Sequence, residues 1–259
     1  MKKVVKIVLV VVFVLLLGLG CLMAVFGFMP DAQGLDAGGQ TEMGVEEEAP
    51  VQTLDIGVQK NDNDELVFDV TLDDFIASYN GYYWQDNEAC YLRPLDEWQV
   101  SALDNTVESA YPVTQYKHRA EDNVWTLSVM NVMVPEGGKD IQQVDLNYDE
   151  HSYSEASYAL FEKDCYYTLK VFFPDLSDEQ LTALYEAVNQ GAYDNTFPST
   201  QQYRAGSAQL PAMLYYRDGI GVFGYFAIGA PVHFCVVPVD DAMIAEYAAS
   251  GVDVQKIEG

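Results

Sequence analysis

Basic residues are scarce in this sequence, which has 13 Lys and Arg side chains against 40 Asp and Glu and a formal net charge of −27. A protein that binds nucleic acid needs a clustered basic face to release the counterions of the phosphate backbone. The same shortage argues against electrostatic docking on anionic lipid. We therefore expect no nucleic-acid partner. Apolar residues still make up 49% of the chain, so the excess of acids does not indicate a disordered tail.

Catalytic signatures are lacking as well. The 3 histidines and 4 cysteines form no H-E-x-x-H or C-x-x-C spacing, and the sequence contains no G-x-S-x-G, S-x-x-K or P-loop motif. A G-x-G-x-x-G match begins at Gly219, but strand-like residues follow it where a dinucleotide site needs a helix. Glycines within a strand explain this match better. The sequence assigns no catalytic residue, and an enzyme is the less favoured class.

Three cysteines lie beyond the N-terminal region at widely separated positions, Cys90, Cys165 and Cys235. Outside the cytoplasm one disulfide is feasible, and Cys90–Cys165 is the pairing we expect if a bridge forms. Free thiols are an equal alternative. Cys235 lies in an alternating strand pattern, which is typical of a buried, apolar cysteine.

The N-terminus holds a long apolar run. Lys2, Lys3 and Lys6 precede an uninterrupted apolar segment over residues 7–29. This run is long enough to span a hydrocarbon core of about 30 Å. The basic head predicts a single-pass anchor in the cell membrane with the C-terminal domain outside. The alternatives are a cleaved signal segment that leaves a secreted domain, and a lipoprotein anchored by lipidation of Cys21.

Composition divides the rest of the chain into two parts. Residues 30–52 contain Gly, Pro, Gln and three consecutive Glu but no aromatic residue, which is typical of an acidic flexible linker. Residues 53–259 are enough for one domain or two joined halves. The expected organisation is a transmembrane anchor or signal segment over 1–29, a linker over 30–52 and an extracytoplasmic α+β domain over 53–259.

Helical periodicity occurs in four places. Two expected helices have clear ends: 72–79, capped by Thr71 and stopped by Asn80-Gly81, and 178–190, opened by the capping box at Ser177 and stopped by Gly191. A third run begins at Ser152 with Glu155 and continues to Phe172, and the last expected helix is 242–249. Residues 164–173 also alternate as a strand does, but we favour the long helix, paired with the next one as a hairpin.

Strand patterns form two clusters. The first contains 113–119, 124–134 and 141–148, and the second contains 212–217, 220–228 and 232–237, with the hairpin dipeptide Asp218-Gly219 between its first two strands. Each cluster is a three-stranded antiparallel meander that follows helical sequence. Because the strands adjoin without intervening helices, we predict an α+β fold. It would consist of two helix-plus-antiparallel-meander units, related as a pseudo-repeat, behind a single N-terminal transmembrane helix.

Aromatic residues gather just after the first of these helices. The candidate ligand-binding residues are Tyr82, Tyr83, Trp84, Tyr91 and Trp98. Exposed rings stack on sugars or on partner side chains, so this group is a candidate surface for cell-wall glycan or for a protein partner. Core packing of the same rings is the alternative.

Acidic residues suggest one cofactor, calcium. Asp145, Asn147 and Asp149 have the 1-3-5 spacing of a calcium loop. Glu150 stands where such a loop has Gly, and Ala156 stands where it has its last Glu, so polar loop residues explain the pattern better. A pair of carboxylates could also hydrolyse glycosides, but with 40 acids no pair identifies itself.

The favoured function is an acidic, membrane-anchored, extracytoplasmic binding or interaction module of a bacterial cell surface. The alternatives are a secreted, carboxylate-based hydrolase directed at glycans, and a calcium-stabilised adhesion domain.

Overall fold

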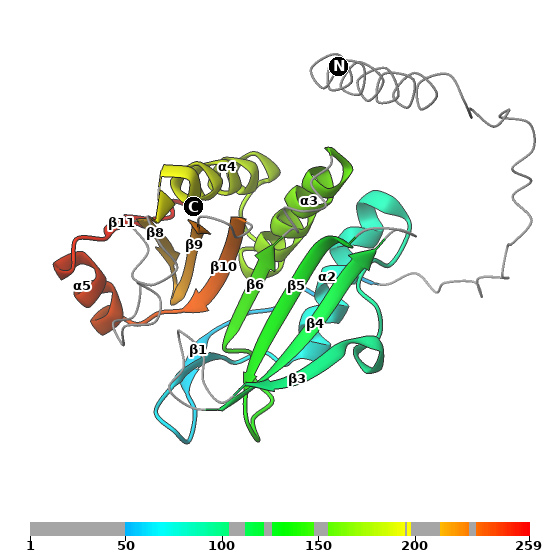
Figure 1. Cartoon of the computed structure of the whole chain (residues 1–259), viewed down its shortest axis with the longest axis horizontal. Helices are drawn as coiled ribbons and strands as arrows, with labels where there is room; N and C mark the ends of the chain where they lie inside the picture. Colours follow the sequence, from blue (N-terminus) through cyan, green and yellow to red (C-terminus); the bar gives the residue numbers. More distant parts are fainter. Residues whose placement is uncertain are drawn as a thin grey trace, which may run out of the picture. The chain divides into compact units, whose positions relative to one another are not determined.

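A mixed β-sheet with helices on both faces organises the chain (Figure 1). The computed structural model describes residues 50–103, 112–121, 126–147, 155–194, 196–197, 213–227 and 232–259. Among these residues the sheet has nine strands, and a separate antiparallel hairpin joins β1 (Val58–Lys60) to β2 (Leu66–Phe68). The α+β class predicted from the sequence is confirmed.

The strand order of the sheet brings the two predicted meanders together. From edge to edge the strands are β3 (Gln99–Leu103), β4 (Val113–Glu121), β5 (Thr126–Pro135), β6 (Gln143–Asn147), β10 (Val232–Pro238), β9 (Ile220–Ala227), β8 (Met213–Arg217) and β11 (Asp253–Lys256). The short strand β7 (Thr196–Phe197) lies parallel to β9, and β11 lies parallel to β8. The meanders β4–β5–β6 and β8–β9–β10 are antiparallel as expected. They pair through β6 and β10, so they are halves of one sheet.

Helices α2 (Leu72–Asn87), α3 (Glu155–Phe172) and α4 (Asp178–Asp194) form a layer on one face of this sheet. The structure also has the 3₁₀ turn η1 (Leu95–Glu97) and helix α5 (Asp241–Ala249). α3 lies against β5 and β6, α4 lies against β9 and β10, and α2 packs on α3. The larger core fills this layer, with Phe161, Leu181 and Phe234 among its buried members.

A smaller core lies on the opposite face. Cys235 and Val237 alternate with Phe234 and Val236 along β10, so they face the other way, and α5 covers them. On this face a helix, α5, packs against one end of the sheet.

Helix α2 extends beyond the stop expected at Asn80-Gly81 and ends at Asn87, followed by the C-cap residue Glu88 with a left-handed φ of 51°. Asn80 is buried and its amide bonds the backbone of Leu92 and Tyr91. A Cβ on Gly81 would lie 2.8 Å from the Pro50 carbonyl oxygen and from the Val51 Cα. These two residues serve tertiary packing, so their turn propensity was a wrong signal for a helix end.

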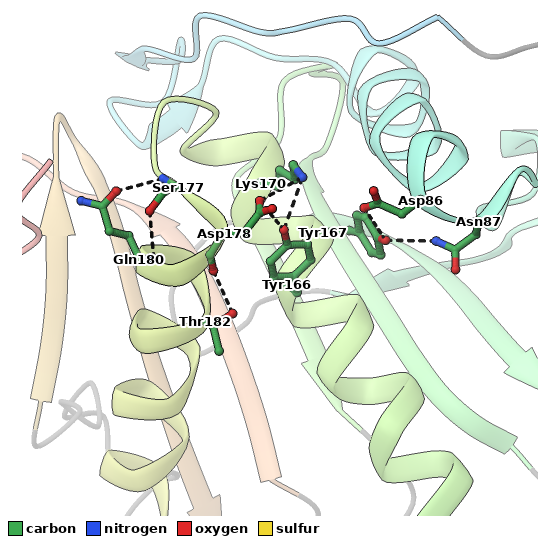
Figure 2. Close-up of polar contacts among 9 residues, drawn as sticks. All are labelled: Asp86, Asn87, Tyr166, Tyr167, Lys170, Ser177, Asp178, Gln180 and Thr182. Atoms are coloured by element: carbon green, nitrogen blue, oxygen red, sulfur yellow. Dashed lines mark hydrogen bonds and ion pairs between the residues drawn. The ribbon is translucent and has the colours of Figure 1, made fainter.

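The helical hairpin of α3 and α4 is confirmed, and residues 164–172 are helical. The capping box at the start of α4 forms as predicted: the Ser177 backbone N–H donates to Gln180 Oε1 at 2.9 Å, and the Gln180 N–H donates to Ser177 Oγ at 3.3 Å (Figure 2). α4 continues past Gly191 to Asp194, so the predicted stop at Gly191 was wrong.

The glycines of the G-x-G-x-x-G match belong to a turn and a strand, as expected. Gly219 has a φ of +85° in the hairpin turn between β8 and β9. A Cβ on Gly224 would lie 2.8 Å from both the Val188 carbonyl oxygen and the Ala192 Cβ, so glycine lets α4 approach β9 closely.

No helix in the described part of the chain has the length and apolar character needed to cross a membrane. The expected anchor over residues 7–29 and the lipidation candidate Cys21 lie outside the described residues.

Candidate functional site

The five aromatic residues proposed from the sequence do not form one surface. Helix α2 turns Tyr82, Tyr83 and Trp84 in three directions, because successive helical residues are about 100° apart. Tyr83 lies in an aromatic cluster, whereas Tyr82 is buried on another side of the helix. Trp84 is half-buried and has no ring contact with any described residue of that cluster.

Four tyrosines, Tyr79, Tyr83, Tyr91 and Tyr167, form what we call the tyrosine cluster. Tyr83 stacks on Tyr91 with the ring centroids 5.2 Å apart, and Tyr79 stacks on Tyr91 at 5.9 Å. Tyr167 from α3 packs against Tyr83 at 5.0 Å. Tyr79 and Tyr167 are buried, and Tyr83 and Tyr91 are half-buried. The cluster therefore runs from the core to the surface.

A buried carboxylate, Asp164 of α3, lies beneath the cluster. The hydroxyls of Tyr79 and Tyr91 donate to it at 2.9 and 3.0 Å, and the Ser128 hydroxyl of β5 also donates. Burial raises the pKa of Asp164 to about 6, although the three hydroxyl donors act in the opposite direction. Asp164 thus links α2, α3, the segment after α2 and the sheet through one side chain.

His118 of β4 adjoins the same cluster. Its ring lies 5.5 Å from Tyr91 and 5.2 Å from Trp98. Only 5% of His118 is exposed, and its Nε2 has no hydrogen-bond partner in the described structure. Burial, together with the nearby charge of Arg93, lowers the pKa of His118 to about 4, so the ring is neutral at pH 7. Trp98 is likewise buried, and its indole N–H donates to the Arg93 carbonyl.

Polar groups surround the outer end of the cluster. The Tyr167 hydroxyl donates to Asp86 Oδ2 at 2.9 Å and accepts from Asn87 Nδ2 at 3.0 Å (Figure 2). Lys163 approaches Asn87 Oδ1 at 3.4 Å. Asp86 and Lys163 are exposed, and Tyr83 is half-buried. The carboxylate, the amide and the ammonium group are connected to Tyr83 through Tyr167, which packs on its ring, and Asn87, which donates to its backbone carbonyl. This combination offers hydrogen-bond donors and acceptors beside an aromatic ring.

Tyr82 has a structural position instead. Its hydroxyl bonds Thr53 Oγ1 at 3.4 Å, and Lys170 Nζ lies 5.7 Å from its ring centroid. Lys170 is also an ion-pair partner of Asp178, and Tyr166 donates to that carboxylate at 2.6 Å (Figure 2). These contacts join α3 to the start of α4 and to the segment before α2.

The calcium candidates Asp145 and Asn147 lie in β6, on the sheet face opposite α3. Asp145 is buried and contacts His233 Nδ1 at 3.0 Å, the Cys235 thiol at 3.3 Å and Asn147 Nδ2 at 3.1 Å. Burial acts to raise the pKa of Asp145, but the neighbouring His233 and the hydrogen bonds lower it below its ordinary value. Asp149 lies outside the described residues.

Metal binding remains a prediction. Among the residues that the structure describes, no group of three or more His, Cys, Asp or Glu side chains is arranged to hold a metal ion. Asp145 and Asn147 belong to a strand and not to a loop, and the oxygens of Asp145 already have protein partners. Of the two alternatives left open for the cysteines, the structure has the free thiols: Cys90, Cys165 and Cys235 form no disulfide, so the Cys90–Cys165 pairing does not occur.

The two buried carboxylates with opposite pKa shifts do not form a hydrolytic pair. Asp164 bonds Ser128, and Asp145 contacts Asn131 at 3.4 Å. Ser128 and Asn131 are three residues apart in β5, so they face opposite sides of the sheet. Asp145 and Asp164 therefore cannot flank one glycosidic bond.

Sequence reasoning missed Tyr79, His118, Asp164 and Tyr167 as members of the site. A signal for Asp164 existed: it lies three residues after Phe161 and four before Thr168, which places a carboxylate on the apolar face of the predicted helix. The convergence of Tyr91 and His118 on that face had no sequence signal, because they come from different elements.

Comparison with models of protein families gave no match, and no curated protein or solved structure is significantly similar to the chain.

Proposed function

We propose that the chain is a membrane-anchored, extracytoplasmic binding module of a bacterial cell surface, held by residues 1–29 and separated from the membrane by the linker over 30–52. The apolar run with its basic head supports the anchor and its direction. The absence of catalytic motifs favours binding over catalysis. We further propose that the two meanders, each preceded by helical sequence, are a structural pseudo-repeat.

The ligand that we propose is a cell-wall glycan, bound at the outer end of the tyrosine cluster. The observation behind this proposal is the half-buried Tyr83, whose ring is stacked on Tyr91 and packs on Tyr167, the residue whose hydroxyl bonds Asp86 and Asn87. Sugars present an apolar ring face and a rim of hydroxyls, and an aromatic ring with adjacent carboxylate and amide groups complements both. The packing of Tyr83 against Tyr91 and Tyr167 holds the ring in place before the ligand arrives.

Titration calorimetry of the full chain in detergent micelles tests the proposal, with soluble cell-wall glycan fragments as the probe. Tyr83→Ala should weaken binding about tenfold, since a lost aromatic stack is equivalent to about 1.5 kcal/mol. Tyr83→Phe should retain the affinity because it keeps the ring. Tyr247→Ala, which removes a half-buried tyrosine from α5, is the matched control. Equal affinity of Tyr83→Ala and the wild type, or no binding by the wild type, would refute the proposal.

A further inference from the structure

Within the described residues, the edge strand β3 lacks the devices that normally protect the edge of a sheet. Its five residues, with the sequence QVSAL, contain no charged residue and no proline. Four of them are exposed, and the fifth is half-buried. The pairing with β4 is regular from Gln99↔Lys117 to Leu103↔Val113, without a bulge. Natural proteins commonly block such edges with charges, prolines or bulges, because an open edge pairs with other chains.

The other edge of the same sheet shows the contrast. β11 begins with Asp253 and ends with Lys256, and it is one residue shorter than β3. Charges of this kind discourage pairing with another strand. Val100 of β3 is 60% exposed, and it is the large apolar side chain most open to solvent within the described ranges. The exposed edge is thus also the place where an apolar side chain is left uncovered.

The beginning of β3 is firmly held. Trp98, the residue before the strand, is buried against His118, and its indole N–H bonds the Arg93 carbonyl at 2.9 Å. The 3₁₀ turn η1 precedes it, and the Trp98 N–H bonds the Leu95 carbonyl at 3.1 Å. A strand fixed in this way presents its outer backbone groups without losing conformational freedom when a partner binds, which favours association.

We propose that β3 accepts an extended, lysine- or arginine-flanked segment of a partner protein as an added strand of the sheet. Main-chain hydrogen bonds between β3 and the partner segment would provide affinity, and side chains of that segment would make apolar contact with Val100. Charge complementarity selects a basic partner: Asp96 and Glu97 are exposed just before the strand, and the chain has a net charge of −27. A second copy of the chain is disfavoured because it would bring the same acids and the same net charge together.

The experiment uses the full chain in detergent micelles and a fluorescein-labelled synthetic peptide, Lys-Thr-Val-Thr-Val-Thr-Val-Thr-Lys. Fluorescence anisotropy should show binding that weakens with added salt, and the same peptide with Glu at both ends should bind about tenfold more weakly. Hydrogen exchange of the β3 amides should slow when the basic peptide binds, while exchange in β11 stays unchanged.

Variants locate the contact. Val100→Lys should weaken peptide binding about tenfold, because it places a positive charge and a long polar side chain on the open edge. Gln255→Lys makes the equivalent change at an exposed position of β11 and should bind as the wild type does. Tyr83→Ala should also leave peptide affinity unchanged, which separates this proposal from glycan binding at the tyrosine cluster.

Three outcomes would overturn the inference. The first is equal binding of the two peptides, and the second is an affinity that Val100→Lys does not change. The third is a dimer of the chain alone in sedimentation velocity that Val100→Lys abolishes, since the occupant of the edge would then be a second copy.

Discussion

Folding raises the pKa of Asp164 and lowers the pKa of His118. These opposite shifts predict how the stability of the protein depends on pH. Both side chains contact Tyr91, and both are buried. We consider Asp164→Asn, which removes the ionisation and keeps the size. We also consider His118→Phe, which removes the ionisation and keeps an aromatic ring. The Nε2 atom of His118 has no hydrogen-bond partner among the described residues, so the substitution breaks no described bond of that atom.

The sign for Asp164 follows from its raised pKa. Below pH 3.8 the carboxyl is protonated in both the folded and the unfolded chain. As the pH rises to about 6, the unfolded chain ionises first, so the stability associated with protonated Asp164 is lost. A pKa raised from 3.8 to about 6 corresponds to about 3 kcal/mol of unfolding free energy.

His118 has the opposite sign because its pKa is lowered. Above pH 6.5 the ring is neutral in both states, and its contribution to stability is fully present. As the pH falls toward 4, the unfolded chain takes up the proton first, and about 3 kcal/mol is lost. Between pH 4 and 6.5 the two contributions nearly cancel in the wild type.

Urea unfolding of the full chain in detergent micelles, followed by tryptophan fluorescence between pH 4 and 7, measures this compensation. On acidification from pH 7 to pH 4, Asp164→Asn should lose about 2–3 kcal/mol more unfolding free energy than the wild type. His118→Phe should instead gain about 3 kcal/mol relative to the wild type over the same range. The double variant should return to the pH slope of the wild type. If both single variants follow the wild-type slope, the opposing shifts do not exist.

Two further predictions concern packing. Asn80→Ala should lower the unfolding free energy by about 3 kcal/mol in the same urea assay, because it removes the partner of the part-buried Tyr91 N–H and of the buried N–H and carbonyl of Leu92. A loss under about 0.5 kcal/mol would show that these hydrogen bonds are unimportant. Gly224→Ala should cost about 1–3 kcal/mol, since its methyl group would meet the Val188 carbonyl and Ala192. Gly191→Ala, its control within α4, should be neutral or stabilising by up to about 1 kcal/mol because only ordinary contacts lie near that Cβ; a reversed order of the two variants would contradict the packing described.

Periodic patterns predicted the elements well, and isolated breaker residues predicted their ends poorly. The long helix that ends at Phe172 and the hairpin at Asp218-Gly219 are as expected. α2 passes through Asn80-Gly81 because the energies of tertiary hydrogen bonds and close packing exceed the small local preference of these residues for a turn. β3 and β11 were not predicted, since short edge strands lack the alternation that a half-buried strand shows.

Local patterns in the sequence predicted only part of the candidate site. The sequence pointed to Tyr83 and Tyr91 as neighbours in the chain, and both lie in the tyrosine cluster. Asp164 is 73 residues from Tyr91 and 85 from Tyr79, so no local pattern could connect them. Tyr82 and Trp84 were grouped with Tyr83 by adjacency, but the helix turns them away from it.

The sequence by itself determined the charge, the α+β class and the likeness of residues 7–29 to a membrane anchor, because composition and short-range periodicity are properties of neighbouring residues. The scarcity of basic residues noted at the outset also underlies the proposed preference of β3 for a basic partner. Tertiary structure alone decided that the two meanders form one sheet, that Asp164 and His118 lie next to the same tyrosine, and that β3 is an edge strand of the sheet that the structure describes. Those outcomes depend on which elements pair across the sheet, and that pairing is set by long-range burial and hydrogen bonding.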